Sequence, residues 1–431
     1  MFFSGFKGGI HPPDRKEQTK NCPVKELEPT ELMTFIMAQG GKPCTPCVAI
    51  GDKVLKGQVI GDSKEFMSAP VHSSVSGTVE KIDKVLSPRG DMAEAVIIRN
   101  DFEDKEASVG ETFPVGYVSK DELIGIVRNA GMVGMGGAGF PTHVKLSTDK
   151  KIDTVIINAA ECEPYLNSDY RTMVERPDDM IDGLDLLLHA FGIFKGIIAI
   201  EDNKADAAKI LKDKLRSNMQ IKVLKTRYPQ GSEKQLIYSV TERKVPEGGL
   251  PADIGVLVFN VDTVSSMSRA VRSGIPVTRR VVTVAGLALK EPGNFLVRIG
   301  TPFWKVFEAA GGFVCQPKKI VMGGPMMGIA QCSIDIPVTK TCSGLLALTD
   351  DDIGTKEEMP CLRCGRCISA CPMGLMPVVL NKLVNKKEWD EAEKGGIMNC
   401  IECGCCAYSC PSDRNPASTI RRGKSALRAK R

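Results

Sequence analysis

Two cysteine runs near the C-terminus decide how this chain is interpreted: CLRCGRCISACP (361–372) and CIECGCCAYSCP (400–411). Each has the spacing C-x2-C-x2-C-x3-C-P, so its first three thiols can wrap one face of a cubane through a tight loop, while the fourth, at the start of a helix, reaches across. The two runs therefore predict two 4Fe-4S clusters. A pair of zinc sites with four cysteines each is the alternative.

The same spacing is typical of bacterial two-cluster ferredoxins, in which the fourth cysteine of each run binds the other cluster. This predicts one cluster on Cys361, Cys364, Cys367 and Cys410, and a second on Cys400, Cys403, Cys406 and Cys371. Cys405 adjoins Cys406 and could replace it, although the spacing favours Cys406. We therefore expect a ferredoxin module at this end of the chain.

The segment 376–394 between the runs is predicted to be a helix, which makes the module a helix-expanded ferredoxin. Pro377 stands at its start, and the apolar residues near helical spacing are Val379, Leu380, Leu383, Val384 and Trp389. The last residues, from Arg414 to Arg431, are basic and contain no acid. They are expected either to contact anionic lipid or an acidic partner, or to be a disordered solubilising end.

The composition is that of a folded multidomain protein, because 431 residues exceed what one core usually serves and 42% of them are hydrophobic. No signal peptide and no apolar stretch long enough to span a membrane are visible. The 16 cysteines then predict metal ligation or redox chemistry in a reducing cytoplasm rather than disulfide bonds. Nucleic acid is disfavoured, since aromatic residues make up only 5% and no basic stripe is present.

Upstream of the cysteine runs, the hydrophobic pattern changes twice along the chain. Residues 42–99 are predicted to form short strands between glycine turns, and APVHSSVSGTVEKI (69–82) resembles half of a barrel-sandwich hybrid domain without the Lys that carriers modify. Residues 119–263 alternate amphipathic segments with four apolar runs, which predicts an α/β domain with a largely parallel sheet. The four runs are TVIINAA, GIIAIE, QIKVLK and VLVFNV.

Residues 278–349 return to short strands around one predicted helix at 302–310. Trp304, Val306 and Phe307 have the spacing of a buried helix face. This segment resembles a β-grasp module of the SLBB type.

A dense glycine loop, GMVGMGGAGFP (131–141), lies inside the α/β region. Glycine lets backbone N–H groups approach phosphate oxygens, so the loop predicts phosphate or nucleotide binding, with a close-packed turn as the alternative. It does not follow a clear strand, and the Rossmann fingerprint is therefore not met.

Four motifs in this region resemble the FMN- and NADH-binding subunit of respiratory complex I, in the same order along the chain. GMGGAGFPTHVK (134–145) is similar to that family's flavin loop GRGGAGFPTGxK, and NAAECEP (158–164) to its NADESEPG segment. YPQGSE (228–233) is similar to YxxGEE, and FNVDT (259–263) to NNVET. In that family these segments bind FMN and stack NADH on it, and a β-grasp module follows.

The likeness is narrower still when SGFKGGIHPP (4–13), the barrel-sandwich segment and both cysteine runs are included. Together they resemble the RnfC family, a component of the Rnf ion-translocating electron-transport complex, over essentially the whole chain. Two departures from complex I are Met135 in place of the loop Arg and Ser232 in place of the first Glu of GEE. The lost Arg puts its contact with the flavin in doubt.

This resemblance implies roles for single residues. Gly134, Gly136, Gly137, Ala138 and Phe140 would line the isoalloxazine; Lys145, Asn158 and Asn260 would hold polar or phosphate groups; and Glu161, Glu163 and Glu233 would lie toward NADH. Without the family match we would interpret Lys145 as a solvated charge, the two Asn as strand-end caps and the three Glu as surface residues.

The implied organisation is multidomain α/β. It comprises an N-terminal arm (1–30), a barrel-sandwich hybrid domain (31–110), a Rossmann-like FMN/NADH-binding domain (111–270), a β-grasp module (271–350), a two-cluster ferredoxin module (355–415) and a basic tail (416–431).

The resemblance also implies a function. NADH gives a hydride and a cluster takes one electron, so FMN would convert between them. The chain would be a peripheral subunit on the cytoplasmic face of the membrane, an NADH:ferredoxin oxidoreductase component whose complex translocates Na⁺ or H⁺. Its partners would include an iron–sulfur subunit that exchanges electrons with ferredoxin.

Two rival functions stay open: a soluble flavin and iron–sulfur reductase like the cobalamin reductases, and a scaffold whose clusters are purely structural. The pair Cys44 and Cys47 is interpreted as ordinary thiols, with a redox or metal role as the alternative. The coupling ion, the reduction potentials and the direction of electron flow do not follow from the sequence.

Overall fold

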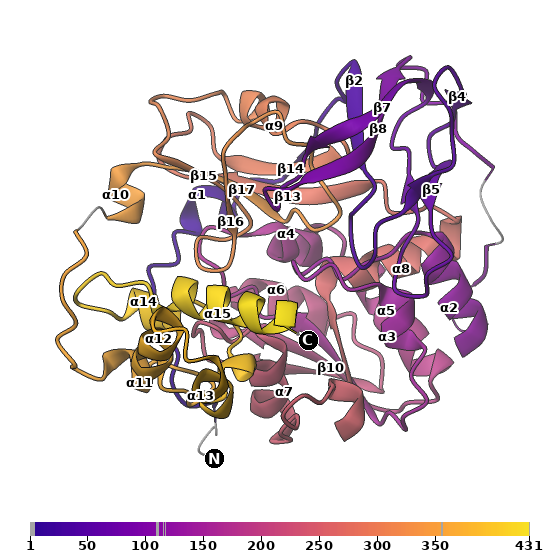
Figure 1. The fold of residues 1–431 in the computed structure, drawn as a ribbon. Coiled ribbons are helices and arrows are strands. Elements are labelled where there is room, and N and C mark those ends of the chain that lie inside the picture. The colour runs from indigo at the N-terminus through magenta and orange to yellow at the C-terminus, as the bar shows by residue number, and fades with distance from the viewer. Residues whose placement is uncertain (1–4, 109–111, 115, 117, 355–356, 431) are drawn as a thin grey trace.

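A computed structural model describes residues 5–108, 112–114, 116, 118–354 and 357–430. The expected boundaries at 110–111 and 355, the first residues of the arm and the last residue of the tail lie outside this described part. In Figure 1 the barrel-sandwich strands and the C-terminal cysteine module lie at opposite corners of the view, with the α/β and β-grasp units between them. The predicted fold class is confirmed.

The barrel-sandwich unit consists of two small antiparallel sheets packed on each other. One has the strand order β2-β8-β7-β4 and the other β3-β5-β6. Their bounds are β2 (Leu32–Ile36), β3 (Thr45–Pro46), β4 (Lys53–Val54), β5 (Val59–Asp62), β6 (Val71–His72), β7 (Gly77–Leu86) and β8 (Met92–Asn100). Met33, Phe35, Ile60 and Ile98 are fully buried between them, as expected where alternate residues face a common core.

The α/β unit has a parallel sheet of order β11-β10-β9-β12. The strands are β9 (Thr154–Ala159), β10 (Gly196–Glu201), β11 (Met219–Leu224) and β12 (Val256–Asn260), which confirms the four predicted runs. The helices are α2 (Lys120–Asn129), α3 (Thr142–Leu146), α4 (Ser168–Glu175), α5 (Pro177–Ala190), α6 (Ala205–Lys212), α7 (Glu233–Thr241) and α8 (Val261–Ser273), with short 3-10 turns η1 (Asp202–Lys204) and η2 (Pro251–Ile254).

Both faces of this sheet are covered, which explains why its strands are continuous apolar runs. Val155 and Ile157 of β9 join the core formed with α5 and α8. Ile156 points to the other face and packs with Leu236 and Ile237 of α7.

The β-grasp unit is a six-stranded sheet of order β1-β14-β13-β17-β15-β16. It contains β13 (Arg279–Ala285), β14 (Gly293–Arg298), β15 (Lys319–Met322), β16 (Ile329–Gln331), β17 (Gly344–Leu348) and helix α9 (Phe303–Ala309). Its edge strand β1 (Val24–Glu26) comes from the N-terminal arm, after helix α1 (Glu17–Lys20), and pairs in parallel with β14. The arm is therefore built into this sheet.

The C-terminal module is helical around its two cysteine runs. Its elements are α11 (Arg366–Ser369), α12 (Pro377–Asn385), α13 (Trp389–Lys394), η3 (Ile397–Asn399), α14 (Cys405–Tyr408) and α15 (Pro416–Lys430), and α10 (Asp350–Ile353) precedes it. Leu380 and Val384 of α12 pack with Ile420 and Leu427 of α15. The last helix thus completes the small core of the module.

Two local expectations about helices were wrong. Trp304 is 38% exposed, whereas Phe303 is buried with Val306 and Phe307. Phe303 stands three residues before Val306 and four before Phe307 and so completes the buried stripe, and Trp304 lies at its edge. The helix expected at 376–394 is broken into α12 and α13, since Lys387 adopts a left-handed conformation (φ 60°).

Of the two alternatives for the tail, the disordered end is contradicted, because residues 416–430 form α15 and pack on α12, and contact with lipid or an acidic partner stays a prediction. Within α15, Lys424 is buried and pairs with Glu402 at 2.7 Å, and Arg421 pairs with the same carboxylate at 2.9 Å. Part of the basic charge of the tail is therefore used inside the module.

Candidate functional site: a nucleotide crevice beside two cysteine sets

The strand order of the α/β unit reverses between β9 and β12, and we call the loop region at the carboxyl ends of these two strands the crevice. The first strand of the sheet in chain order, β9, has β10 and β11 on one side and β12 on the other. In open parallel sheets ligands bind outside the carboxyl ends of the strands where the strand order reverses. Asn158 and Asn260 are register partners at the ends of these two strands, so two of the predicted residues meet at that point.

Asn260 positions the helix that begins there. Its side-chain oxygen accepts hydrogen bonds from the backbone N–H groups of Asp262 (2.9 Å) and Thr263 (3.3 Å), which caps α8. Its side-chain amide donates to Asp169 Oδ2 at 2.6 Å. Asn158 donates to the Gly231 carbonyl at 2.8 Å. Both Asn are therefore caps and strand-end anchors in this structure.

The glycine loop lies over the N-terminus of α8. The Gly134 N–H donates to the Phe140 carbonyl at 2.7 Å, and the Met135 N–H to Thr263 Oγ1 at 3.0 Å. A Cβ at Gly136 would approach the Asn260 side chain at 3.4 Å, and one at Gly137 would meet nothing within 4 Å. Residues 136–138 are exposed, so the loop leaves open space of the kind that a planar ligand needs.

Lys145 and Glu233 form an ion pair at the same edge of the sheet. The Lys145 ammonium lies 2.8 Å from Glu233 Oε1, donates to the Val258 carbonyl at 2.8 Å and stands over the Phe259 ring. Phe140 is 40% exposed near the end of the loop. Neither Lys145 nor Glu233 is a free surface charge.

Glu161 and Glu163 are engaged by backbone N–H groups. Glu161 accepts from the N–H groups of Asp169 (2.9 Å) and Tyr170 (3.2 Å) at the start of α4. Glu163 accepts from those of Met326 (3.0 Å) and Met327 (2.9 Å) of the β-grasp unit. Burial raises the pKa of Glu163 to about 7, although these N–H groups oppose the shift. Their proposed role toward NADH stays a prediction.

Two residues that sequence reasoning missed support this crevice. Burial, together with the Glu161 and Asp262 carboxylates, raises the pKa of Asp169, which faces Asn260. Arg280 is 1% exposed, pairs with Asp262 at 2.8 Å and donates to the Met135 carbonyl at 3.2 Å. Arg280 comes from β13 of the next unit, so no local pattern could have revealed it.

The two cysteine runs have the same local backbone geometry. Arg363 and Gly365 in the first run, and Glu402 and Gly404 in the second, all have left-handed φ values between 54° and 79°. In each run the N–H at the first of these positions donates to the first cysteine sulfur at 3.4 Å. Cys405 takes the place in the second run that Arg366 has in the first, which is not one of the predicted ligand positions.

The thiols divide into an inner and an outer set. Cys371, Cys400, Cys403 and Cys406, the inner set, are partly or fully buried and line one small cavity, which Cys405 lines as well. They are the thiols predicted for the second cluster. Cys361, Cys364, Cys367 and Cys410, the outer set, include two exposed thiols, Cys361 and Cys364.

Within the described residues, no three His, Cys, Asp or Glu side chains converge on a point suited to one metal ion. A cubane takes its four thiolates on separate irons and does not need such a point. The ligand sets stay a prediction.

The inner set is docked against the rest of the molecule. The Tyr228 hydroxyl donates to the Cys403 carbonyl at 2.8 Å, and the Gln235 side chain contacts Met373 Sδ at 3.1 Å. The Gly9 N–H donates at 2.9 Å to the carbonyl of Ala370, directly before Cys371. The α/β unit and the N-terminal arm therefore both contact the backbone around the inner set.

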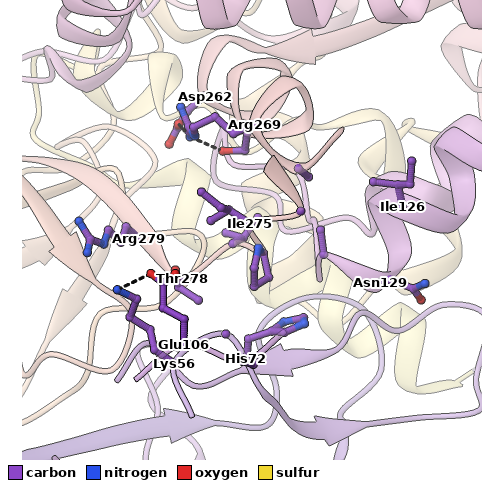
Figure 2. A pocket seen from close by; sticks show the side chains of 18 of the residues that line it. Lys56, His72, Glu106, Ile126, Asn129, Asp262, Arg269, Ile275, Thr278 and Arg279 are labelled. Carbon is purple, nitrogen blue, oxygen red and sulfur yellow. Dashed lines mark hydrogen bonds and ion pairs between the residues drawn. The ribbon is translucent and has the colours of Figure 1, made fainter. Parts of the chain in front are cut away.

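A separate cavity of about 810 Å³ lies where the barrel-sandwich, α/β and β-grasp units meet (Figure 2). Three of its cations are paired: Lys56 with Glu106 at 2.9 Å, Arg269 with Asp179 at 3.0 Å, and Arg279 with Glu26 at 2.5 Å. The glycine loop does not line it. This cavity is distinct from the crevice at β9 and β12.

Known families match the chain in the order of these units. The matches are the RnfC barrel sandwich hybrid domain (residues 4–103), the Nuo51 FMN-binding domain (127–269), the SLBB domain (281–330) and a 4Fe-4S dicluster domain (360–414). The fold and site thus define a flavin and iron–sulfur electron-transfer protein. More particularly, the chain belongs to the RnfC family, the C subunits of Rnf complexes.

Relatives cover most of the chain. The C subunit of the proton-translocating ferredoxin:NAD(+) oxidoreductase complex of Clostridium ljungdahlii is 45% identical over 90% of this chain and 86% of its own length. Its Na(+)-translocating counterpart from Acetobacterium woodii is 43% identical over 99% and 98%. The C subunit of the ion-translocating oxidoreductase complex of Rhodobacter capsulatus is 38% identical over 91% and 77%.

Among solved structures, an NAD+-reducing [NiFe]-hydrogenase in the air-oxidized state shares the fold with a TM-score of 0.54 and 18% identity, over 73% of this chain and 63% of that one. In the described part of the chain, no helix has both the length and the apolar character needed to cross a membrane.

Proposed function

We propose that this protein is the NADH-linked subunit of an Rnf-type membrane complex. It exchanges electrons between NAD(H) and ferredoxin-linked partners through FMN and two 4Fe-4S clusters, and the whole complex couples this flow to Na⁺ or H⁺ translocation. The related C subunits belong to ferredoxin:NAD(+) oxidoreductase complexes, which supports this activity.

The observation that carries the proposal is the position of the inner cysteine set. It contacts the same α/β unit whose switch point brings the glycine loop, Asn158 and Asn260 together. A protein that passes electrons from NADH to iron–sulfur clusters must hold a hydride acceptor and a one-electron acceptor close together. Here both would lie beside the same α/β unit.

Bound FMN would supply the conversion between two-electron and one-electron chemistry. The chain's own task is positioning. Gly136 and Gly137 leave room for the ring, the N-terminus of α8 directs the positive end of its helix dipole toward an anion, and Lys145 supplies a cation at the same edge. Glu233, half-exposed beside Lys145, is the carboxylate best placed to accept from a ribose hydroxyl.

The cysteine sets would hold the two clusters in series. Cys403 and Cys406 of the inner set are buried beside the α/β unit, and Cys361 and Cys364 of the outer set are exposed. Cys405 is fully buried against Tyr228 and Ala370 and acts as a packing residue. Electrons would therefore leave the protein at Cys361 and Cys364.

For its place in the cell, we propose peripheral attachment on the cytoplasmic face, where ferredoxin and NADH are found. The partner would be an iron–sulfur subunit of the same complex. Purification of the chain with integral membrane subunits separates this function from that of a soluble reductase of the cobalamin-reductase type.

The direct test is anaerobic reduction by NADH after reconstitution with iron, sulfide and FMN. We expect stoichiometric FMN, bleaching of the flavin on NADH addition and then EPR signals from reduced clusters. Absence of bleaching in protein that retains both clusters would reject the NADH-linked role.

A variant pair locates the flavin. Gly136→Val fills the open space of the loop and is expected to abolish FMN binding while both clusters remain. Gly125→Val adds the same side chain on α2 where nothing lies within 4 Å, and it should retain FMN. Equal FMN content in the two variants would place the flavin elsewhere.

A further inference from the structure

The first cysteine run and the helix that follows it carry exposed apolar side chains together with exposed cations, and the two segments contact each other. We call this surface the outer face and define it by Leu362, Arg363, Arg366, Met376, Val379 and Lys382. Leu362 is 69% exposed and Met376 51%. Exposed Leu and Met side chains around a redox site are typical of a surface that another protein covers.

The charge of this face has one sign. Residues 359–387 contain five Lys or Arg and no Asp or Glu, whereas residues 388–413 contain six Asp or Glu and one Lys. Within the described part of the chain, Arg363, Arg366 and Lys382 make no ion pair, in contrast to Arg421 and Lys424 beside the inner set. Their charges are free to act on a partner.

Two of these cations adjoin the outer thiols along the chain, and the third lies on α12, which contacts α11. Arg363 lies between Cys361 and Cys364, and Arg366 begins α11 directly before Cys367. Met376, Val379 and Lys382 follow at helical spacing along the start of α12, so they share one exposed side of that helix.

We propose that the outer face docks an acidic iron–sulfur protein, one whose own redox centre is ringed by Asp and Glu. The apolar residues provide the contact that brings two redox centres close together, and the unpaired cations steer an acidic partner to it and reject a basic one. The proposal deepens the function above and rests on it.

The electron balance sets what crosses this face. Two single-electron transfers from the reduced partner, together with one proton from water, match the reduction of one NAD⁺ to NADH, and the reverse flow balances likewise. No bond forms between the partners, so the encounter can be weak and fast, as steering by charge favours.

The experiment uses an acidic two-cluster bacterial ferredoxin, reduced with dithionite and freed of the excess, mixed with the oxidised, reconstituted protein in a stopped-flow instrument. For the triple variant Arg363→Glu, Arg366→Glu, Lys382→Glu, we expect ferredoxin oxidation to be slower by about tenfold or more at low ionic strength. The deficit should shrink as salt is added. Glu is a suitable replacement at Arg363, since Glu402 holds the same left-handed conformation in the second run.

The matched control is Lys53→Glu, Lys84→Glu, which reverses two exposed cations of the barrel-sandwich unit. It should leave the rate unchanged. With the NADH-reduced protein as donor and basic cytochrome c as acceptor, the triple variant should instead be faster than the parent.

EPR of both clusters checks that the variants are intact, and the neutral set Arg363→Gln, Arg366→Gln, Lys382→Gln replaces the charge-reversed set if a cluster is lost. Unchanged ferredoxin oxidation, or an equal loss in the control, would overturn the docking proposal. If instead the proposed function is wrong, NADH will not bleach the flavin of the parent protein. That result does not depend on the rate at which the protein oxidises ferredoxin, so the two failures can be told apart.

Discussion

At the residue scale, Lys424 is a buried cation beside the inner cysteine set. Its ammonium lies 2.7 Å from the Cys400 carbonyl oxygen and 2.7 Å from Glu402 Oε1. Because Arg421 shares that carboxylate, two cations stand against one anion beside Cys400. Such an excess of positive charge favours the more negative, reduced form of a cluster and raises its reduction potential.

We therefore predict that Lys424→Gln makes the potential of the inner cluster more negative, whereas Lys424→Arg largely restores it. An EPR-monitored redox titration measures this, with the outer cluster as reference in the same sample. Arg428→Gln, an exposed position on α15, is the control and should shift neither cluster. Equal potentials in Lys424→Gln and the parent would contradict the prediction.

His72 predicts a pH dependence of stability. Burial and then the nearby Lys340 ammonium lower the pKa of His72 from 6.5 to about 3. Below pH 6.5 the unfolded chain binds a proton that the native His72 refuses, so stability from this group is lost as pH falls from 6.5 toward 3. His72→Asn should flatten the stability profile in that window. Calorimetry at several pH values measures it, with His189→Asn at an exposed position of α5 as control.

At the element scale, α15 is held by a glycine in its middle. A Cβ at Gly423 would stand 2.5 Å from Val384 Cγ2 and 2.9 Å from Ile397 Cδ1. Gly→Ala in a helix usually gains about 1 kcal/mol, but overpacking costs typically about 1–3 kcal/mol. The helix can approach α12 only because this position has no side chain.

Gly423→Ala is accordingly expected to lower the stability of the C-terminal module by about 1 kcal/mol. Loss of the clusters on thermal unfolding, followed by visible absorbance, is the readout. Ser425→Ala, at an exposed position two residues later, serves as the matched control and should leave the midpoint unchanged or raise it. A higher midpoint for Gly423→Ala would show that the helix can move away.

At the scale of the whole molecule, the N-terminal arm ties distant parts of the chain together. It contributes β1 to the β-grasp sheet and contacts the C-terminal module at Ala370 and Cys371. Gly8 has a φ of 76°, and a Cβ there would lie 2.6 Å from the Cys371 carbonyl oxygen. The arm thus packs directly against the backbone of the inner set.

Gly8→Ala should destabilise the packing of the arm on the C-terminal module by about 2 kcal/mol. The left-handed backbone at this position disfavours a residue with a side chain, and the neighbouring carbonyl leaves no room for a Cβ. We expect faster hydrogen exchange at the Gly9 amide and slower reduction of the clusters by NADH. Gly5→Ala, where a Cβ meets nothing within 4 Å, should behave like the parent. Identical exchange in both variants would contradict the prediction.

Much of the fold could be predicted because its signals are local. The apolar runs of β9, β10 and β12 identify buried parallel strands, and the cysteine spacing identifies the C-terminal module. Contacts between remote segments could not be predicted in this way. The pairing of β1 with β14, and Arg280 beneath Met135, join residues more than a hundred positions apart.

The candidate site shows the same division. The motif order indicated the glycine loop, Asn158 and Asn260, and the sheet order then placed both Asn at one crevice. The motif did not show that Glu163 would bind the N–H groups of Met326 and Met327 from the β-grasp unit. A carboxylate in a loop takes whichever donors the neighbouring unit presents, and those are set by packing.

The sequence by itself determined that two equivalent cysteine runs and one glycine loop are present, because spacing and residue type are local properties of a chain. Only the tertiary structure decided which thiols are inner and which are outer. The two runs have the same local backbone geometry. The inner thiols differ from the outer ones in solvent exposure, because Tyr228, the arm and α15 pack around the inner set. Solvent exposure is a property of the whole assembly of units, and here it separates the thiols that face the α/β unit from those that are open to a partner.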